Sequence, residues 1–147
     1  MRLSAIVIAA ALSAAPFFPA AAQDGDPEAG RRVFAQCRAC HIIDASARNN
    51  VGPNLAGLWG RRAAQREGFR YSANLVQLGA SGHEWNEANL RAYLTDPKAV
   101  APQGSMAFAG IRNPEQLTNL IAYLRTNANP LPLPAPAGAP AAAPAGG

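Results

Sequence analysis

Two cysteines and a histidine at short spacing have the most specific chemistry in this chain of 147 residues. Cys37 and Cys40 stand three positions apart, and His41 follows the second cysteine directly. Within one helical turn both sulfur atoms face the same side, where each can form a thioether bond to one vinyl group of a porphyrin. The histidine then lies under the porphyrin iron. The spacing therefore predicts covalent attachment of one haem c, with its iron bound by His41.

Two other kinds of site use a similar cysteine pair. A redox-active disulfide of the thioredoxin type lies at the head of a βαβ unit, and no strand pattern precedes Cys37. A structural zinc site needs four nitrogen or sulfur ligands, and after these three residues only His83 remains. Cys40 and His41 are also sequence neighbours, which makes two tetrahedral positions on one ion difficult to reach. Both alternatives are weaker than haem attachment.

The first 22 residues have the pattern of a secretory signal. Arg2 provides the positive start, an apolar run follows, and small residues precede a cleavage position after Ala22. The apolar run is too short to cross a membrane, so we expect cleavage, with an uncleaved anchor as the alternative. Export agrees with haem chemistry, because haem is attached to thiols outside the cytoplasm. The sequence thus predicts a soluble periplasmic protein.

The other end of the chain also differs from its middle. Residues 130–147 contain only Pro, Leu, Ala and Gly, which predicts a disordered Pro/Ala-rich tail, partly in polyproline II conformation. Residues 23–129 then form one domain, which is small for a fold without a structural disulfide. A buried haem would supply the missing apolar core.

The charge of the chain argues against nucleic-acid binding. Without Arg2, 12 of the 13 basic residues remain against 9 acidic residues, a net charge of +3. A nucleic-acid binder would show a dense stripe of Lys and Arg.

Four segments have helical patterns and none has a convincing strand pattern, so we expect an all-α fold of about four helices. Each helix has an expected start: Asp26-Pro27, Ser72, Asn86 and Asn113-Pro114. The first helix is expected to deliver the cysteines at its end, Gly79 to end the second, and Pro97 to end the third. Residues 42–70 lack periodicity, which indicates long loops draped over a cofactor.

Met106 is the only methionine outside the signal, and it lies in a Pro/Gly-rich loop. Its thioether is a soft, neutral ligand that favours reduced iron and raises the reduction potential. The alternative role is filling a gap in the core. His83 is the rival sixth ligand, although an exposed loop histidine is its simpler explanation. If His41 and Met106 fill both axial positions, no open site is left for a substrate, which favours an electron carrier over a haem enzyme.

The order of spaced motifs resembles that of class I cytochromes c, in the mitochondrial and bacterial cytochrome c2-like branch. The resemblance covers about residues 25–127. It rests on Phe34, Cys37-Arg38-Ala39-Cys40-His41, Gly52-Pro53-Asn54-Leu55, Gly57-Leu58-Trp59-Gly60-Arg61, Gly68-Phe69-Arg70-Tyr71-Ser72, Trp85, Leu90-Arg91-Ala92-Tyr93-Leu94, Pro97, Pro102, Met106-Ala107-Phe108 and Leu120-Ile121-Ala122-Tyr123-Leu124.

The resemblance implies roles around the haem. Pro53 would accept a hydrogen bond from the His41 ring and so hold the axial ligand. Tyr71 and Trp85 would donate to the haem propionates, with Arg61 near the same carboxylates.

On the methionine side, the resemblance places Tyr93 beside the Met106 sulfur and Phe108 over the haem edge. Lys98 is the only lysine of the chain, whereas mitochondrial members surround the haem edge with many. Partner identity therefore does not follow from the resemblance.

The sequence as a whole predicts a monomeric electron carrier that is not an enzyme. It would pass single electrons between transient redox protein partners, among them a possible membrane-bound oxidase or reductase, with no small-molecule substrate. One alternative is an electron-transfer subunit tethered to a particular dehydrogenase or oxidase. A haem peroxidase or gas sensor is the weaker alternative, because it needs an open coordination position.

Overall fold

The computed structural model describes residues 25–46 and 48–128, and these residues form an all-α fold with five helices. The helices are α1 (Pro27–Phe34), α2 (Ala73–Ala80), α3 (Glu87–Thr95), α4 (Pro97–Val100) and α5 (Pro114–Asn127). Among the described residues, the only β-type pairing is an isolated bridge between Arg62 and Glu84. The predicted signal and the whole predicted tail lie outside the described residues. Within the described ranges, no helix is long and apolar enough to cross a membrane.

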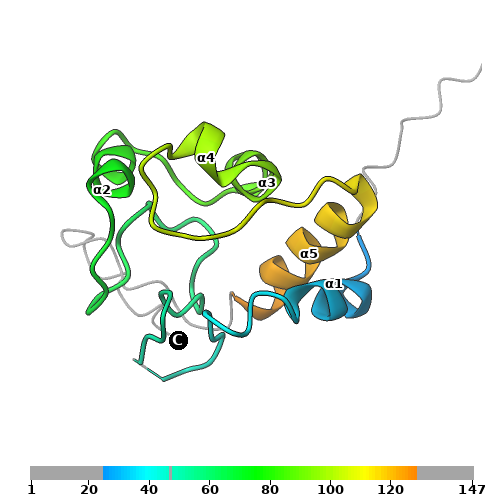
Figure 1. The fold of residues 1–147 in the computed structure, drawn as a ribbon. Helices are drawn as coiled ribbons and strands as arrows, with labels where there is room; N and C mark the ends of the chain where they lie inside the picture. The colour runs from blue at the N-terminus through cyan, green and yellow to red at the C-terminus, as the bar shows by residue number, and fades with distance from the viewer. Residues whose placement is uncertain (1–24, 47, 129–147) are drawn as a thin grey trace, which may run out of the picture.

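Helices α1 and α5 pack across each other on one side of the molecule, opposite α2 (Figure 1). Each begins as its sequence predicts, because Asp26 accepts from Glu28 N and Asn113 accepts from two amides of its own first turn. The crossing needs a glycine at position 30. A Cβ atom there would lie 2.0 Å from the carbonyl oxygen of Asn119.

The aromatic ring of Phe34 completes this crossing. Its centroid lies 5.2 Å from that of Tyr123, with the two rings tilted by 38°. Phe34 is 4 % exposed, and Leu120 on the facing helix is fully buried. The contact therefore joins the first and last helices directly before the chain reaches the cysteines.

The structure differs from the sequence prediction in the segments that follow α1 and α3. Helix α1 ends at Phe34, so the cysteines lie in the turns that follow it, where Cys37 N donates to Phe34 O. Pro97 does stop α3, but it also occupies the first turn of the unpredicted α4. The Asp96 carboxylate caps α4 by accepting from two of its backbone amides.

One prediction about α2 is wrong, and a second is confirmed only in part. Gly79 does not end the helix, which continues to Ala80. Glycine is required there because a Cβ atom would lie 2.0 Å from the carbonyl oxygen of Ala63. Ser72 precedes the helix as expected, but its side chain forms no capping hydrogen bond.

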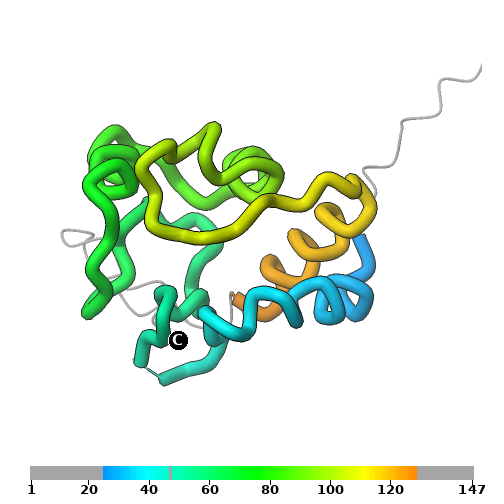
Figure 2. The backbone as a smooth tube through the Cα atoms, in the orientation of Figure 1, coloured from blue at the N-terminus to red at the C-terminus, as the bar shows by residue number. Residues whose placement is uncertain are grey.

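The remaining chain runs as long loops around the centre of the molecule. Figure 2 shows residues 101–113 crossing on the other side of the centre from the segment that follows α1. Two contacts close the base of this loop. Ile111 N donates to Leu94 O at 2.8 Å, and a Cβ atom at Gly110 would lie 2.0 Å from the carbonyl oxygen of Thr95. The centre of the molecule is thus enclosed by the helices together with these long loops.

Replacing Gly30 by Ala should destabilise the fold by about 3 kcal/mol, because the new methyl group must push α1 away from α5. Denaturant unfolding of the haem-loaded protein measures the change. The matched control is Arg31→Ala on the exposed face of the same helix, which should change stability by about 0.5 kcal/mol or less. Equal stability of the Gly30 variant and the wild type would contradict this account of the crossing.

Candidate functional site

The ten residues that the sequence predicts as site residues all line one cavity at the centre of the fold. They are Cys37, Cys40, His41, Pro53, Arg61, Tyr71, Trp85, Tyr93, Met106 and Phe108. The cavity has a volume of about 290 Å³, close to the lower end of the range for small-molecule sites, roughly 300–1,000 Å³. Its other walls are mainly leucines from α2, α3 and α5. An apolar hollow with two thiols at its edge suits an apolar, covalently attached group.

The two cysteines are free thiols on one wall of this cavity. Cys37 is half-buried and Cys40 is exposed. Burial, and then the nearby Cys40, raise the pKa of the Cys37 thiol from 9.0 to about 11. No group of three or more His, Cys, Asp or Glu residues in the described ranges is placed to hold a metal ion. Since both cysteines are free, each thiol is available for a thioether bond.

The His41 ring is held from two directions. Its Nδ1 lies 2.8 Å from the carbonyl oxygen of Pro53, and because a carbonyl only accepts, Nδ1 carries the hydrogen. That tautomer leaves the Nε2 lone pair free to bind a metal. Gly52 lies against the ring, since a Cβ atom there would be 2.4 Å from His41 Cε1. Gly52 N also donates to Cys40 O at 2.8 Å, which joins the loop that contains Pro53 to the cysteine turn.

Arg61 and Trp85 are brought together by paired backbone segments. Trp85 N donates to Arg61 O at 2.9 Å, and Gly60 N donates to Trp85 O at 3.1 Å. The Arg61 guanidinium donates to Ala56 O at 2.9 Å. Burial lowers the pKa of Arg61 and raises the pKa of Tyr71. This side of the cavity therefore presents a half-buried cation and a phenol whose neutral form is favoured.

Another part of the lining, next to Trp85, is aromatic and sulfur-containing. The Trp85 and Tyr93 rings lie 5.0 Å apart, and burial raises the pKa of Tyr93. Met106 and Phe108 are half-buried in the crossing segment visible in Figure 2. The rival ligand His83 is not among the lining residues. It is half-buried with its ring edge-on to Trp85 at 5.1 Å, so the expectation of an exposed histidine is wrong.

Sequence reasoning missed two residues of this region. Gly52 begins the motif Gly52-Pro53-Asn54-Leu55, but only the folded loop shows that its missing side chain makes room for the His41 ring. Arg66 has a buried Nε atom without any hydrogen-bond partner, although it lies in an irregular loop that looks solvent-exposed in sequence. The clustering of arginines after Trp59 was the available signal. Arg61 lines the cavity and the charge of Arg66 acts on it, and two neighbouring cations suit a group that brings negative charge.

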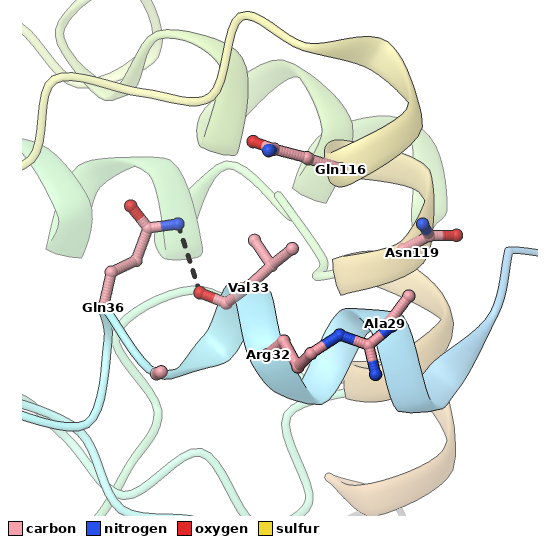
Figure 3. A pocket seen from close by; sticks show the side chains of 7 residues that line it. Ala29, Arg32, Val33, Gln36, Gln116 and Asn119 are labelled. Carbon is pink, nitrogen blue, oxygen red and sulfur yellow. Dashed lines mark hydrogen bonds between the residues drawn. The ribbon is translucent and has the colours of Figure 1, made fainter.

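A second hollow lies on the outer face between α1 and α5 (Figure 3). Its polar groups are the side chains of Arg32, Gln36, Gln116 and Asn119. Two of these are already engaged, because Gln36 Nε2 donates to Val33 O at 3.1 Å and the Asn119 side chain accepts from Asp26 N at 2.8 Å. This hollow contains no nucleophile or metal-binding pair.

An all-α fold around an apolar cavity, with two free thiols followed by a histidine whose Nε2 can bind metal, defines a c-type haem protein. Comparison with known proteins agrees. Residues 27–128 match the family described as Cytochrome c. The chain is 50 % identical over 101 residues to cytochrome c-550 of Nitrobacter winogradskyi, covering 68 % of this chain and 89 % of that protein. It is 41 % identical over 105 residues to cytochrome c2 of Afifella marina, covering 71 % of this chain and 85 % of that protein.

Solved structures show the same similarity. Cytochrome cH from Methylobacterium extorquens superposes with a TM-score of 0.62 at 40 % identity, covering 69 % of this chain and 99 % of that one. Cytochrome c2 from Rhodospirillum centenum gives a TM-score of 0.65 at 35 % identity, covering 70 % of this chain and 98 % of that one. The chain belongs to the cytochrome c family, as a class I, c2-like member. It is a mono-haem electron carrier with one covalently attached haem c.

Stability at high pH should depend on the buried tyrosines of this cavity. Tyrosine in the unfolded chain ionises near pH 10, and burial raises the pKa of Tyr71 and Tyr93 in the fold. Above about pH 10 the unfolded state therefore loses protons first, and the free energy of unfolding falls as pH rises. Tyr93→Phe should lose less stability between pH 9 and pH 11 than the wild type does. Denaturant unfolding at both pH values measures this, and an unchanged loss would refute it.

Proposed function

We propose that this protein is a periplasmic shuttle for single electrons, with its haem iron bound axially by His41 and Met106. The observation that supports this most is that both side chains line one cavity, and the His41 tautomer leaves its Nε2 free. When bound, the haem iron supplies the one-electron redox chemistry. His41 and Met106 would together occupy both iron positions that substrates use, so we expect electron transfer and no enzymatic activity.

The other lining residues would hold the cofactor and keep water away from it. Arg61, Tyr71 and Trp85 offer donors that suit the haem carboxylates. Tyr93 would lie beside the Met106 sulfur, and Phe108 would cover the haem edge.

Met106→Ala should open the sixth coordination position. In the oxidised protein, the near-infrared charge-transfer band between methionine sulfur and iron should disappear. The reduction potential should fall, because the thioether favours reduced iron. Added imidazole should then bind much more tightly than to the wild type. The neighbouring exposed Ser105→Ala is the control and should keep the band. Retention of the band in the Met106 variant would exclude this ligand.

Docking to partners would use the rim where the cavity meets solvent. Among the lining residues, Cys40, Ser105 and Ala107 are exposed and Val51 is 74 % exposed. All four lack charge, and the exposed Arg38 lies between the two cysteines. A small uncharged rim with positive charge beside it suits brief encounters that are steered electrostatically.

Electron transfer to hexacyanoferrate(III), an anionic reagent, should slow as ionic strength rises, because salt screens the attraction. Arg38→Glu should slow the reaction at low salt, with the difference disappearing at high salt. Arg31→Glu on α1, which reverses an exposed charge outside the cavity lining, is the control and should have a smaller effect. Rates that do not change with salt would contradict electrostatic steering through this rim.

An electron-transfer subunit bound to one dehydrogenase or oxidase is the second candidate. The Pro/Ala-rich residues 130–147 and the single lysine favour it. Co-purification of a redox enzyme after mild lysis would support this candidate, whereas isolation as a monomer beginning at Gln23 would support the free periplasmic shuttle.

A further inference from the structure

Arg66 has a buried guanidinium nitrogen without a counter-charge. Its Nη2 donates to the carbonyl oxygen of Ser46 at 3.0 Å, but its Nε atom is buried and has no hydrogen-bond partner. Within the described ranges, no carboxylate forms an ion pair with it. Arg66 as a whole is half-buried, and a positive charge that is partly removed from water is costly unless it is paired. The position of this side chain therefore calls for negative charge nearby.

The neighbours of Arg66 indicate where that charge would be. The Arg61 guanidinium lies close enough for the two positive charges to repel each other, which contributes to the lowered pKa of Arg61 after the larger effect of burial. Arg61 and Tyr71 both line the central cavity. Two neighbouring cations with no carboxylate beside them suit the carboxylates of a haem in that cavity.

Arg66 also lies close to Tyr71. Its backbone and its positive charge both act on the Tyr71 side chain, where they oppose the larger rise in pKa that burial causes. The residue therefore acts on the cavity indirectly, through a side chain that lines it.

The hydrogen bond from Arg66 to Ser46 joins two loops. Ser46 lies in the segment between His41 and Pro53, and its carbonyl oxygen also accepts from the fully buried Asn54 at 2.9 Å. Asn49 Nδ2 adds a parallel link, donating to Glu67 O at 3.0 Å. The loop that follows the histidine is thus fastened to the loop that contains Tyr71.

We propose that Arg66 is a positioning residue for the carboxylate side of the haem site. It fastens the loop after His41 to the loop with Tyr71, and it adds a second cation that offsets the charge of the haem carboxylates. This inference rests on the function proposed above. Positive charge near the iron disfavours its oxidised state, so Arg66 raises the reduction potential.

The experiment compares the reduction potentials of the haem-loaded wild type, Arg66→Gln, Arg66→Lys and Arg62→Gln. Arg62 is exposed and only four positions away, so its variant removes the same charge where solvent screens it. Arg66→Gln should lower the potential several times more than Arg62→Gln does. Arg66→Lys, which retains the charge, should recover most of the difference.

Two further readouts separate positioning from general stability. In a Tyr71→Phe background the shift caused by Arg66→Gln should shrink, since part of it acts through the hydroxyl group. The near-infrared methionine band should persist in every Arg66 variant. Its absence from the wild type would instead refute the axial ligation proposed above.

Equal potential shifts for Arg66→Gln and Arg62→Gln would overturn the proposal, even if the Arg66 variant were less stable to denaturant. A shift that is unchanged in the Tyr71→Phe background would overturn the positioning role.

Discussion

The hydrogen bond between the His41 ring and the Pro53 carbonyl is the constraint on which the site depends. At 2.8 Å it selects the ring tautomer, and the missing side chain of Gly52 allows the loop to approach the ring closely. The same loop is bonded back to Cys40 O through Gly52 N. The thiols and the imidazole therefore belong to one hydrogen-bonded unit, which lies in turns after α1 and not in a long helix through the cysteines.

Helices α1, α4 and α5 support the parts of the cavity lining that lie outside this unit. The crossing of α1 and α5 closes over Gly30, and Phe34 and Tyr123 pack at the crossing just before the cysteine turn. Helix α4, capped by Asp96, begins the loop that contains Met106. The buried apolar side chains pack as one cluster, and nine of its 15 residues also line the central cavity, where a cofactor would complete the core.

The positive charge of this chain comes almost entirely from arginine. The chain has a single lysine and 12 arginines. Two of the arginines, Arg61 and Arg66, lie close together near Tyr71 without a carboxylate of the described chain. Guanidinium groups form planar, paired hydrogen bonds to carboxylates that an ammonium group does not form. In this protein part of the positive charge is thus used inside the fold, where salt screens it little, rather than at the docking rim.

The sequence by itself determined the chemistry and the starts of three helices, because the thioether spacing and the caps Asp26, Asn86 and Asn113 act between residues close along the chain. Only the tertiary structure decided what depends on distant segments. It placed Gly79 against Ala63 instead of at a helix end, and it buried the Arg66 Nε without a partner. Local patterns record hydrogen bonds within a turn, whereas close approaches and burial arise only when the loops fold around the cavity.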